Sequence, residues 1–174
     1  MNDAERRTIE GWIEKASNHL QVAREHAKSH YRSSEAIQAA QECTELSVKA
    51  VLSFLSIEYP LKHEWDPEKK PFAAIARQIR ERCLLDGLAG QDLSDSVPLP
   101  RLLMLLNFWG QFHLIAKYGF EPERLAAAQD LFRPDEAKLA VQHAEECYRA
   151  ASAIRYHDRE KLAMLQGRAS GPTT

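Results

Sequence analysis

The stretch AIQAAQECTELSVKAVL, residues 36–52, decides the fold. Small apolar residues cover nearly every side of a helix with this sequence, so the helix must bury most of its circumference. Its polar residues form a thin stripe, in which Gln41, Glu45 and Lys49 are spaced four apart and share one face. Two interpretations stay open. The stripe is either a helix-surface ion pair, worth about 0.2–0.5 kcal/mol, or a functional or subunit-contacting stripe on a buried helix.

Amphipathic segments lie on both sides of this stretch. Apolar residues at steps of three and four predict a helix over residues 4–31, with a stripe made of Ile9, Trp12, Ile13, Ala16, Leu20, Ala23, Ala27 and Tyr31. Ser33 and Ser34 are expected to cap the second helix, which runs to about residue 57. Further helices are predicted over residues 72–87, 99–118, 121–132 and from Pro134 to about residue 154.

No strand-like alternation interrupts these helices, and short connections between long helices favour antiparallel neighbours. The predicted fold is therefore all-α, an antiparallel four- to five-helix up-and-down bundle. A single domain is expected over residues 1–166, followed by a disordered tail, GRASGPTT, over residues 167–174.

Composition limits the class of protein. The chain has 174 residues, of which 44% are apolar, enough for one domain with a core. A net charge of −2 argues against strong, sequence-independent binding of nucleic acid. It does not exclude a basic patch on one face of the protein. Cys43, Cys83 and Cys147 are expected to be reduced core residues. The charged N-terminus and the lack of a long apolar run predict a cytoplasmic protein with no membrane span.

The sequence lacks the motifs of several common kinds of functional site. His26 and His30 have the spacing that can chelate a metal, and His19 lies on the same helix edge. No HExxH motif or further carboxylate accompanies them, so we expect no metal and a solvated or dimer-flanking histidine edge. The sequence also lacks a GxSxG turn, a glycine-rich phosphate loop and a DNA-binding motif, and no cofactor is predicted.

Cations gather in the segment AKYGFEPER, residues 116–124. Lys117 and Arg124 lie close to a predicted helix end and to Tyr118, where they could contact phosphate. The alternative is that Lys117 interacts with the last carbonyls of its own helix.

The sequence resembles the HEPN family, the higher-eukaryote and prokaryote nucleotide-binding domains, over residues 8–156. The resemblance is most specific in the second helix, where family members show an alanine–glutamine–x–x–glutamate–x–x–x–lysine–alanine run. The residues that fit this run are Ala40, Gln41, Glu45, Lys49 and Ala50. Other supporting residues are Trp12, Ala16, Leu20, Ala23, Pro60, His63 and the run Ala116–Lys117–Tyr118–Gly119.

The resemblance implies an antiparallel bundle, usually a symmetric homodimer, that acts on RNA or nucleotides. Many relatives are toxins of toxin–antitoxin pairs encoded beside a small nucleotidyltransferase, so such a partner is expected here. The expected ligand-binding residues are Lys117, Tyr118, Arg124, Lys49 and His63.

Catalytic relatives use an arginine followed, after four to six residues, by a histidine. Here Arg24 and His30 have this spacing, but a continuous helix would place them about 240° apart. A branch of the family carries an arginine–tyrosine–proline-like turn after the penultimate long helix. Lys117, Tyr118 and Gly119 occupy the comparable place here, with lysine instead of arginine, and lysine lacks the bidentate fork for phosphate. The sequence therefore favours a nucleotide- or RNA-binding protein without ribonuclease activity. The alternatives are a metal-independent endoribonuclease with His63 or His113 as base, and a non-catalytic structural adaptor.

Overall fold

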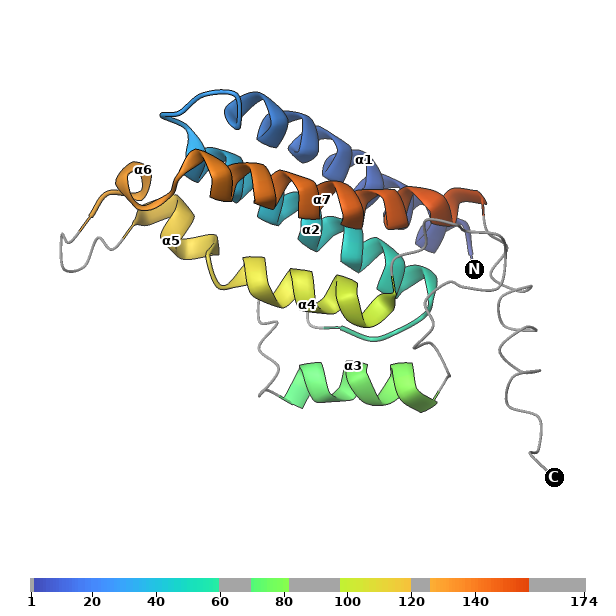
Figure 1. Cartoon of the computed structure of the whole chain (residues 1–174). Coiled ribbons are helices and arrows are strands. Elements are labelled where there is room, and N and C mark those ends of the chain that lie inside the picture. Colours follow the sequence, from blue (N-terminus) through green and yellow to red (C-terminus); the bar gives the residue numbers. More distant parts are fainter. Residues whose placement is uncertain (1, 60–69, 82–97, 120–125, 157–174) are drawn as a thin grey trace.

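The computed structural model describes residues 2–59, 70–81, 98–119 and 126–156. These ranges contain helices and no strand, which confirms the all-α prediction (Figure 1). The elements are α1 (Asp3–His26), α2 (Ser33–Phe54), α3 (Lys70–Glu81), α4 (Leu99–Gly110), α5 (His113–Tyr118), α6 (Ala128–Leu131), α7 (Pro134–Ala153) and the short 3₁₀ helix η2 (Ile154–Tyr156).

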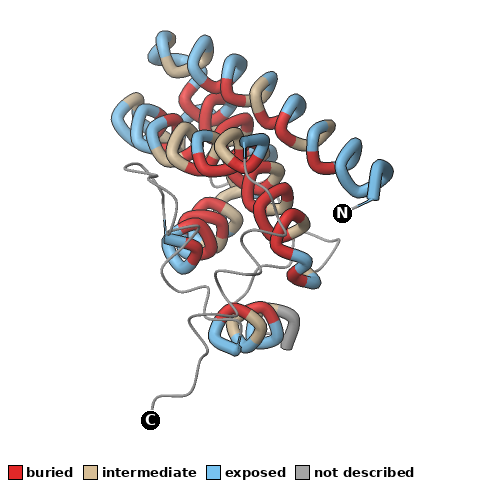
Figure 2. Tube along the Cα trace, turned by 90° about the vertical axis from the view of Figure 1, so that its right-hand side faces the viewer, coloured by how far each residue is buried: buried red, intermediate tan, exposed pale blue. Residues whose placement is uncertain are grey.

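Helix α2 is the centre of the bundle, as its sequence predicted. It packs against α1, α4, α5, α6 and α7, and helices α1, α2, α4 and α7 alternate in direction along the chain (Figure 1). Buried residues gather where the helices face one another (Figure 2). Fully buried alanines, Ala36 and Ala40 on α2 and Ala140 and Ala144 on α7, leave room for the backbones to approach closely. Among the described helices, none has the length and hydropathy that a bilayer span requires.

Two predicted features of the first connection are wrong. Helix α1 ends at His26, so Tyr31 lies outside it and is almost fully exposed instead of extending the apolar stripe. Ser33 is the first residue of α2, and Arg32 occupies the N-cap position without a side-chain cap. Both Ser33 and Ser34 are buried, and the Ser34 hydroxyl donates to the Glu35 carboxylate at 3.0 Å.

The predicted helix over residues 99–118 is two helices. Helix α4 ends at Gly110, a residue with low helix propensity. The Phe112 N–H then bonds to the Trp109 carbonyl at 3.0 Å, three residues back, which makes a tighter turn than an α-helix. Helix α5 starts immediately after this turn. The break therefore decides the direction in which His113, the first residue of α5, points.

The cysteines that the structure describes behave as core residues. Cys43 and Cys147 are free thiols with no exposed surface, and the Cys43 Sγ lies 3.8 Å from the Ala144 carbonyl oxygen. Burial raises the pKa of the Cys43 thiol to about 12 and raises the pKa of Cys147 as well, so both are protonated at neutral pH. Cys83 lies outside the described residues.

Polar side chains of α4 form hydrogen bonds to side chains of α7. The Arg101 guanidinium donates from Nε and Nη2 to the Glu146 carboxylate, which lowers the pKa of Glu146. One turn earlier on α7, His143 Nδ1 accepts a hydrogen bond of 3.1 Å from the Nε1–H of Trp109 on α4. Desolvation lowers the pKa of His143, and the nearby charge of Arg101 adds to this effect.

The His143 contact predicts a pH-dependent stability. Because the folded-state pKa lies below the unfolded value, the unfolded chain takes up the proton first, and stability falls as the pH drops below about 6.5. In His143→Gln, the amide oxygen can still accept from Trp109 but does not titrate. We expect urea unfolding between about pH 7.5 and 5.5 to show a shallower loss of stability in this variant. Equal slopes in variant and wild type would contradict the assignment.

Candidate functional site

A chain of polar contacts crosses the bundle between α2 and the start of α5. Lys49 Nζ lies 2.7 Å from Glu45 Oε1, and the Gln41 Nε2 group donates to Glu45 Oε2 at 3.1 Å. At the far end, Gln41 Oε1 lies 3.0 Å from His113 Nδ1. We call these four residues, Gln41, Glu45, Lys49 and His113, the polar relay. Three of them come from one face of α2, and the fourth comes from α5.

The polar relay lies inside the protein. Gln41 and Glu45 are 1% and 3% exposed, and the side chain of Lys49 is 11% exposed. The interpretation of the stripe as a helix-surface ion pair is therefore wrong. A buried ion pair loses its hydration, and its attraction offsets that loss only when the remaining polar atoms are also bonded. The amide of Gln41 provides such a bond to Glu45. His113 is half-buried, so the relay approaches the surface at this residue.

Helix α5 places a cation beside the exposed end of the relay. Lys117 follows His113 by four residues on the same helix, so the two side chains share a face. Lys117 is exposed, and its Nζ lies 5.1 Å from the centroid of the half-exposed Tyr118 ring. Within the described ranges, Lys117 forms no salt bridge and no hydrogen bond to its own helix end. An imidazole and an ammonium group on one face can bind the oxygens of a phosphate or ribose.

Comparison with known families identifies the segment that carries most of the relay. The family model for the HEPN domain matches residues 9–66. The HEPN resemblance is confirmed for this segment. It covers most of α1 and all of α2, and hence Gln41, Glu45 and Lys49. Searches of curated proteins and of solved structures returned no match.

The HEPN match ends before α3, so the ligand-binding residues predicted on α5 lie beyond it. Of these, Lys117 and Tyr118 are neighbours on the surface, as described above. Lys49 contacts Glu45 and lies two turns of α2 away from Gln41, the residue that contacts His113 on α5. Arg124 and His63 lie outside the described residues. All five residues remain predicted ligand contacts.

The two residues with the spacing of the catalytic relatives have different environments in the structure. Arg24 donates to Glu145 on α7 at 2.7 Å, whereas His30 is exposed and lies beyond the end of α1. The other histidines of this region form polar pairs: His19 Nε2 lies 3.4 Å from Glu42, and His26 Nδ1 lies 3.4 Å from Arg32. The described residues contain no group of three or more His, Cys, Asp or Glu side chains that could hold a metal ion.

The turn after α5 depends on Gly119. This glycine has φ 66° and ψ −156°, a conformation that residues with a Cβ rarely adopt. A Cβ atom here would lie 2.5 Å from the Ala126 carbonyl oxygen and 2.7 Å from the Ala128 nitrogen. Glycine therefore allows the chain leading to α6 to pass directly against the end of α5, which fixes the position of Lys117 and Tyr118.

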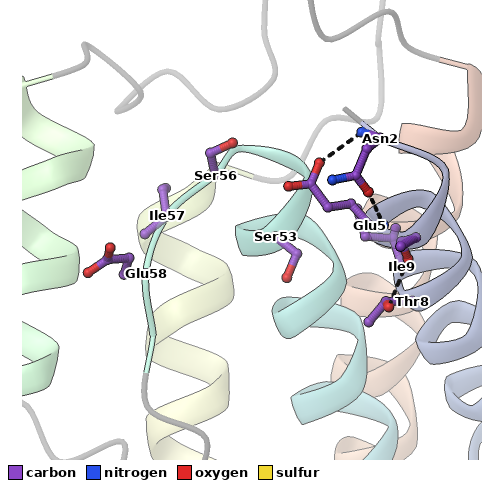
Figure 3. A pocket seen from close by; sticks show the side chains of 9 residues that line it. Asn2, Glu5, Thr8, Ile9, Ser53, Ser56, Ile57 and Glu58 are labelled. Carbon is purple, nitrogen blue, oxygen red and sulfur yellow. Dashed lines mark hydrogen bonds between the residues drawn. The ribbon is translucent and has the colours of Figure 1, made fainter.

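A pocket of about 520 Å³ lies at the opposite end of α2. The start of α1 and the end of α2 line it, and Figure 3 shows Asn2 and Glu5 pointing toward each other there. Their hydrogen bonds, 2.8 and 3.1 Å, cap the first turn of α1. The charged side chains of its described lining are two acids, Glu5 and Glu58. Such a lining does not favour phosphate, so this pocket is not the site that the sequence predicted.

Sequence reasoning identified His113 as a possible base but not as the partner of Gln41. The two residues are 72 positions apart, and only the break after Gly110 turns His113 toward α2. A glycine in an otherwise apolar helix was the sequence feature that could have indicated the break.

Proposed function

We propose that this protein binds RNA or a nucleotide through its phosphate groups, and that His113 and Lys117 on α5 form the centre of the binding site. One observation carries the proposal: an exposed cation lies one helical turn from a histidine that is bonded to the interior of the HEPN-matching helix α2. HEPN domains are often involved in RNA binding or in toxins with nuclease activity. Tyr118 would add an aromatic face against which a base can stack.

Removal of the cation tests this proposal. In Lys117→Ala, the dissociation constant for a labelled single-stranded RNA is expected to rise about tenfold, because a charge-assisted contact worth roughly 1.5 kcal/mol is lost. The slope of log affinity against log salt should also fall by about 0.7, the value for one phosphate contact on a single strand. Fluorescence anisotropy at several salt concentrations measures both quantities.

Lys15→Ala provides the matched control, because Lys15 is exposed on α1, on the other side of α2 from α5. The control should bind RNA as the wild type does. Equal affinities for the wild type and Lys117→Ala would remove Lys117 from the binding site. Failure of all three proteins to bind RNA or nucleotide would favour the adaptor alternative.

A second candidate is a metal-independent endoribonuclease with His113 as general base. The observation that favours it is the 3.0 Å contact with Gln41, because an oriented imidazole is suited to proton transfer. Incubation of the purified protein with RNA in the presence of a chelator tests this candidate. Cleavage that disappears in His113→Ala would support it, and cleavage that persists in this variant would exclude His113.

The partners also remain proposals. A homodimer and a complex with a small nucleotidyltransferase follow from the family resemblance. Light scattering coupled to size-exclusion chromatography distinguishes one copy from two. The Lys117→Ala experiment needs neither assembly, and the same light-scattering measurement on each variant checks that their oligomeric states are equal.

A further inference from the structure

The ion pair at the inner end of the polar relay fixes the charge of Glu45. An ammonium group offers only hydrogens, so Lys49 requires an acceptor, and Glu45 Oε1 lies 2.7 Å away. With the side chains 11% and 4% exposed, the cation favours the ionised form of this carboxyl group. Glu45 is therefore a carboxylate, which can accept hydrogen bonds but cannot donate one.

The carboxylate in turn fixes the direction of the Gln41 amide. Because Glu45 only accepts, the nitrogen of Gln41 must face it, and this contact is 3.1 Å long. The opposite atom of the same amide is then the oxygen. Gln41 Oε1 consequently faces His113. The orientation of the amide in the structure is thus the one that the chemistry of its partners requires.

An amide oxygen also only accepts, so His113 Nδ1 must carry the hydrogen of the 3.0 Å contact. We propose that Gln41 and Glu45 are positioning residues that hold neutral His113 as the Nδ1–H tautomer, which leaves Nε2 as the basic nitrogen. Free histidine favours the other tautomer in water, so the protein would reverse the intrinsic preference. The tautomer is a property of the protein without ligand, but its role in binding rests on the function proposed above.

The basic nitrogen determines which ligand groups His113 can recognise. A neutral ring with a basic Nε2 accepts a hydrogen bond, and so fits a hydroxyl group, such as the 2′-hydroxyl that distinguishes RNA from DNA. A ligand with a ribose hydroxyl at this position would supply such a donor. In the ribonuclease alternative, the same nitrogen would take the proton of that hydroxyl.

Nitrogen-15 NMR of the full-length protein with labelled histidine tests the tautomer directly. At about pH 8, where an ordinary histidine is neutral, the His113 ring is expected to show protonated Nδ1 and unprotonated Nε2. His113→Gln identifies the signals. In Glu45→Gln the new amide can donate to Gln41, so the Gln41 amide can reverse. The His113 signals should then shift toward the Nε2–H form.

Two further variants keep the test decisive. Glu45→Gln/Lys49→Met removes both charges and should show the same shift even if Glu45→Gln alone folds poorly. Glu42→Gln changes a neighbouring carboxylate that contacts His19 instead and should leave the His113 signals unchanged. Nε2–H in the wild type, or no shift in either relay variant, would overturn the inference. A wild type with the expected tautomer that binds no RNA would contradict the proposed function and leave the tautomer assignment standing.

Discussion

Lys49→Met is expected to lower the free energy of unfolding by about 3–5 kcal/mol, because it removes the ammonium group that lies 2.7 Å from a buried carboxylate. The Glu45 side chain is only 4% exposed, so water cannot replace the lost ammonium group without a change in packing. Methionine has a similar length and an apolar stem, so loss of packing makes a small contribution. Urea unfolding followed by circular dichroism at neutral pH measures the difference.

Two controls separate the charge effect from other causes. Arg6→Met breaks an ion pair in which the side chains of Arg6 and Glu10 are 66% and 50% exposed. It should change the free energy of unfolding by less than about 0.5 kcal/mol. Glu45→Gln/Lys49→Met removes both charges while an amide can still accept from Gln41, so it should recover much of the lost stability. If Lys49→Met is no more harmful than Arg6→Met, the ion pair is not a buried element of the core.

Gly119→Ala is expected to destabilise the protein by about 2–3 kcal/mol. The alanine would have to adopt φ 66° and ψ −156°, and its Cβ would lie 2.5 Å from a backbone oxygen. A backbone atom cannot move aside as the end of a flexible side chain can, so the end of α5 has to shift. We also expect weaker RNA binding, because Lys117 and Tyr118 directly precede this glycine.

Gly11→Ala is the matched control for this substitution. Gly11 lies inside α1, and apart from the neighbouring backbone of that helix no described atom lies within 4 Å of the position that a Cβ would take. Alanine favours the helix more than glycine, so Gly11→Ala should stabilise the protein by roughly 0.5–1 kcal/mol. Thermal or urea unfolding of both variants measures the contrast. If the two substitutions have the same sign, the turn after α5 does not depend on glycine.

Much of the fold was predictable because helical periodicity is a local property. The alanine-rich pattern of residues 36–52 identified α2 as central, and Pro134 with the two acids that follow it marked the start of α7 correctly. Helix ends were less predictable. The buried Ser33 and Ser34 do not cap α2, and Tyr31 is on the surface, because tertiary contacts decided where the chain leaves α1.

The candidate site was predictable only in part for the same reason. The spacing of Gln41, Glu45 and Lys49 placed them on one face, and the structure confirms their shared contacts. Whether that face met water or protein could not be read from the spacing alone. The contact with His113 depends on the turn at Gln111 and Phe112, which the apolar pattern of residues 99–118 did not reveal.

The central position of α2 has a consequence for the cooperativity of unfolding. Because its neighbours α1, α4, α5 and α7 each pack on it, removal of any one of them would open its alanine-rich surface and its buried charges to solvent. Partly unfolded species that lack one long helix are therefore costly, and the transition between native and denatured chains should be close to all-or-none. Among the described elements, the short η2 packs on α7, so it can open locally with little effect on α2.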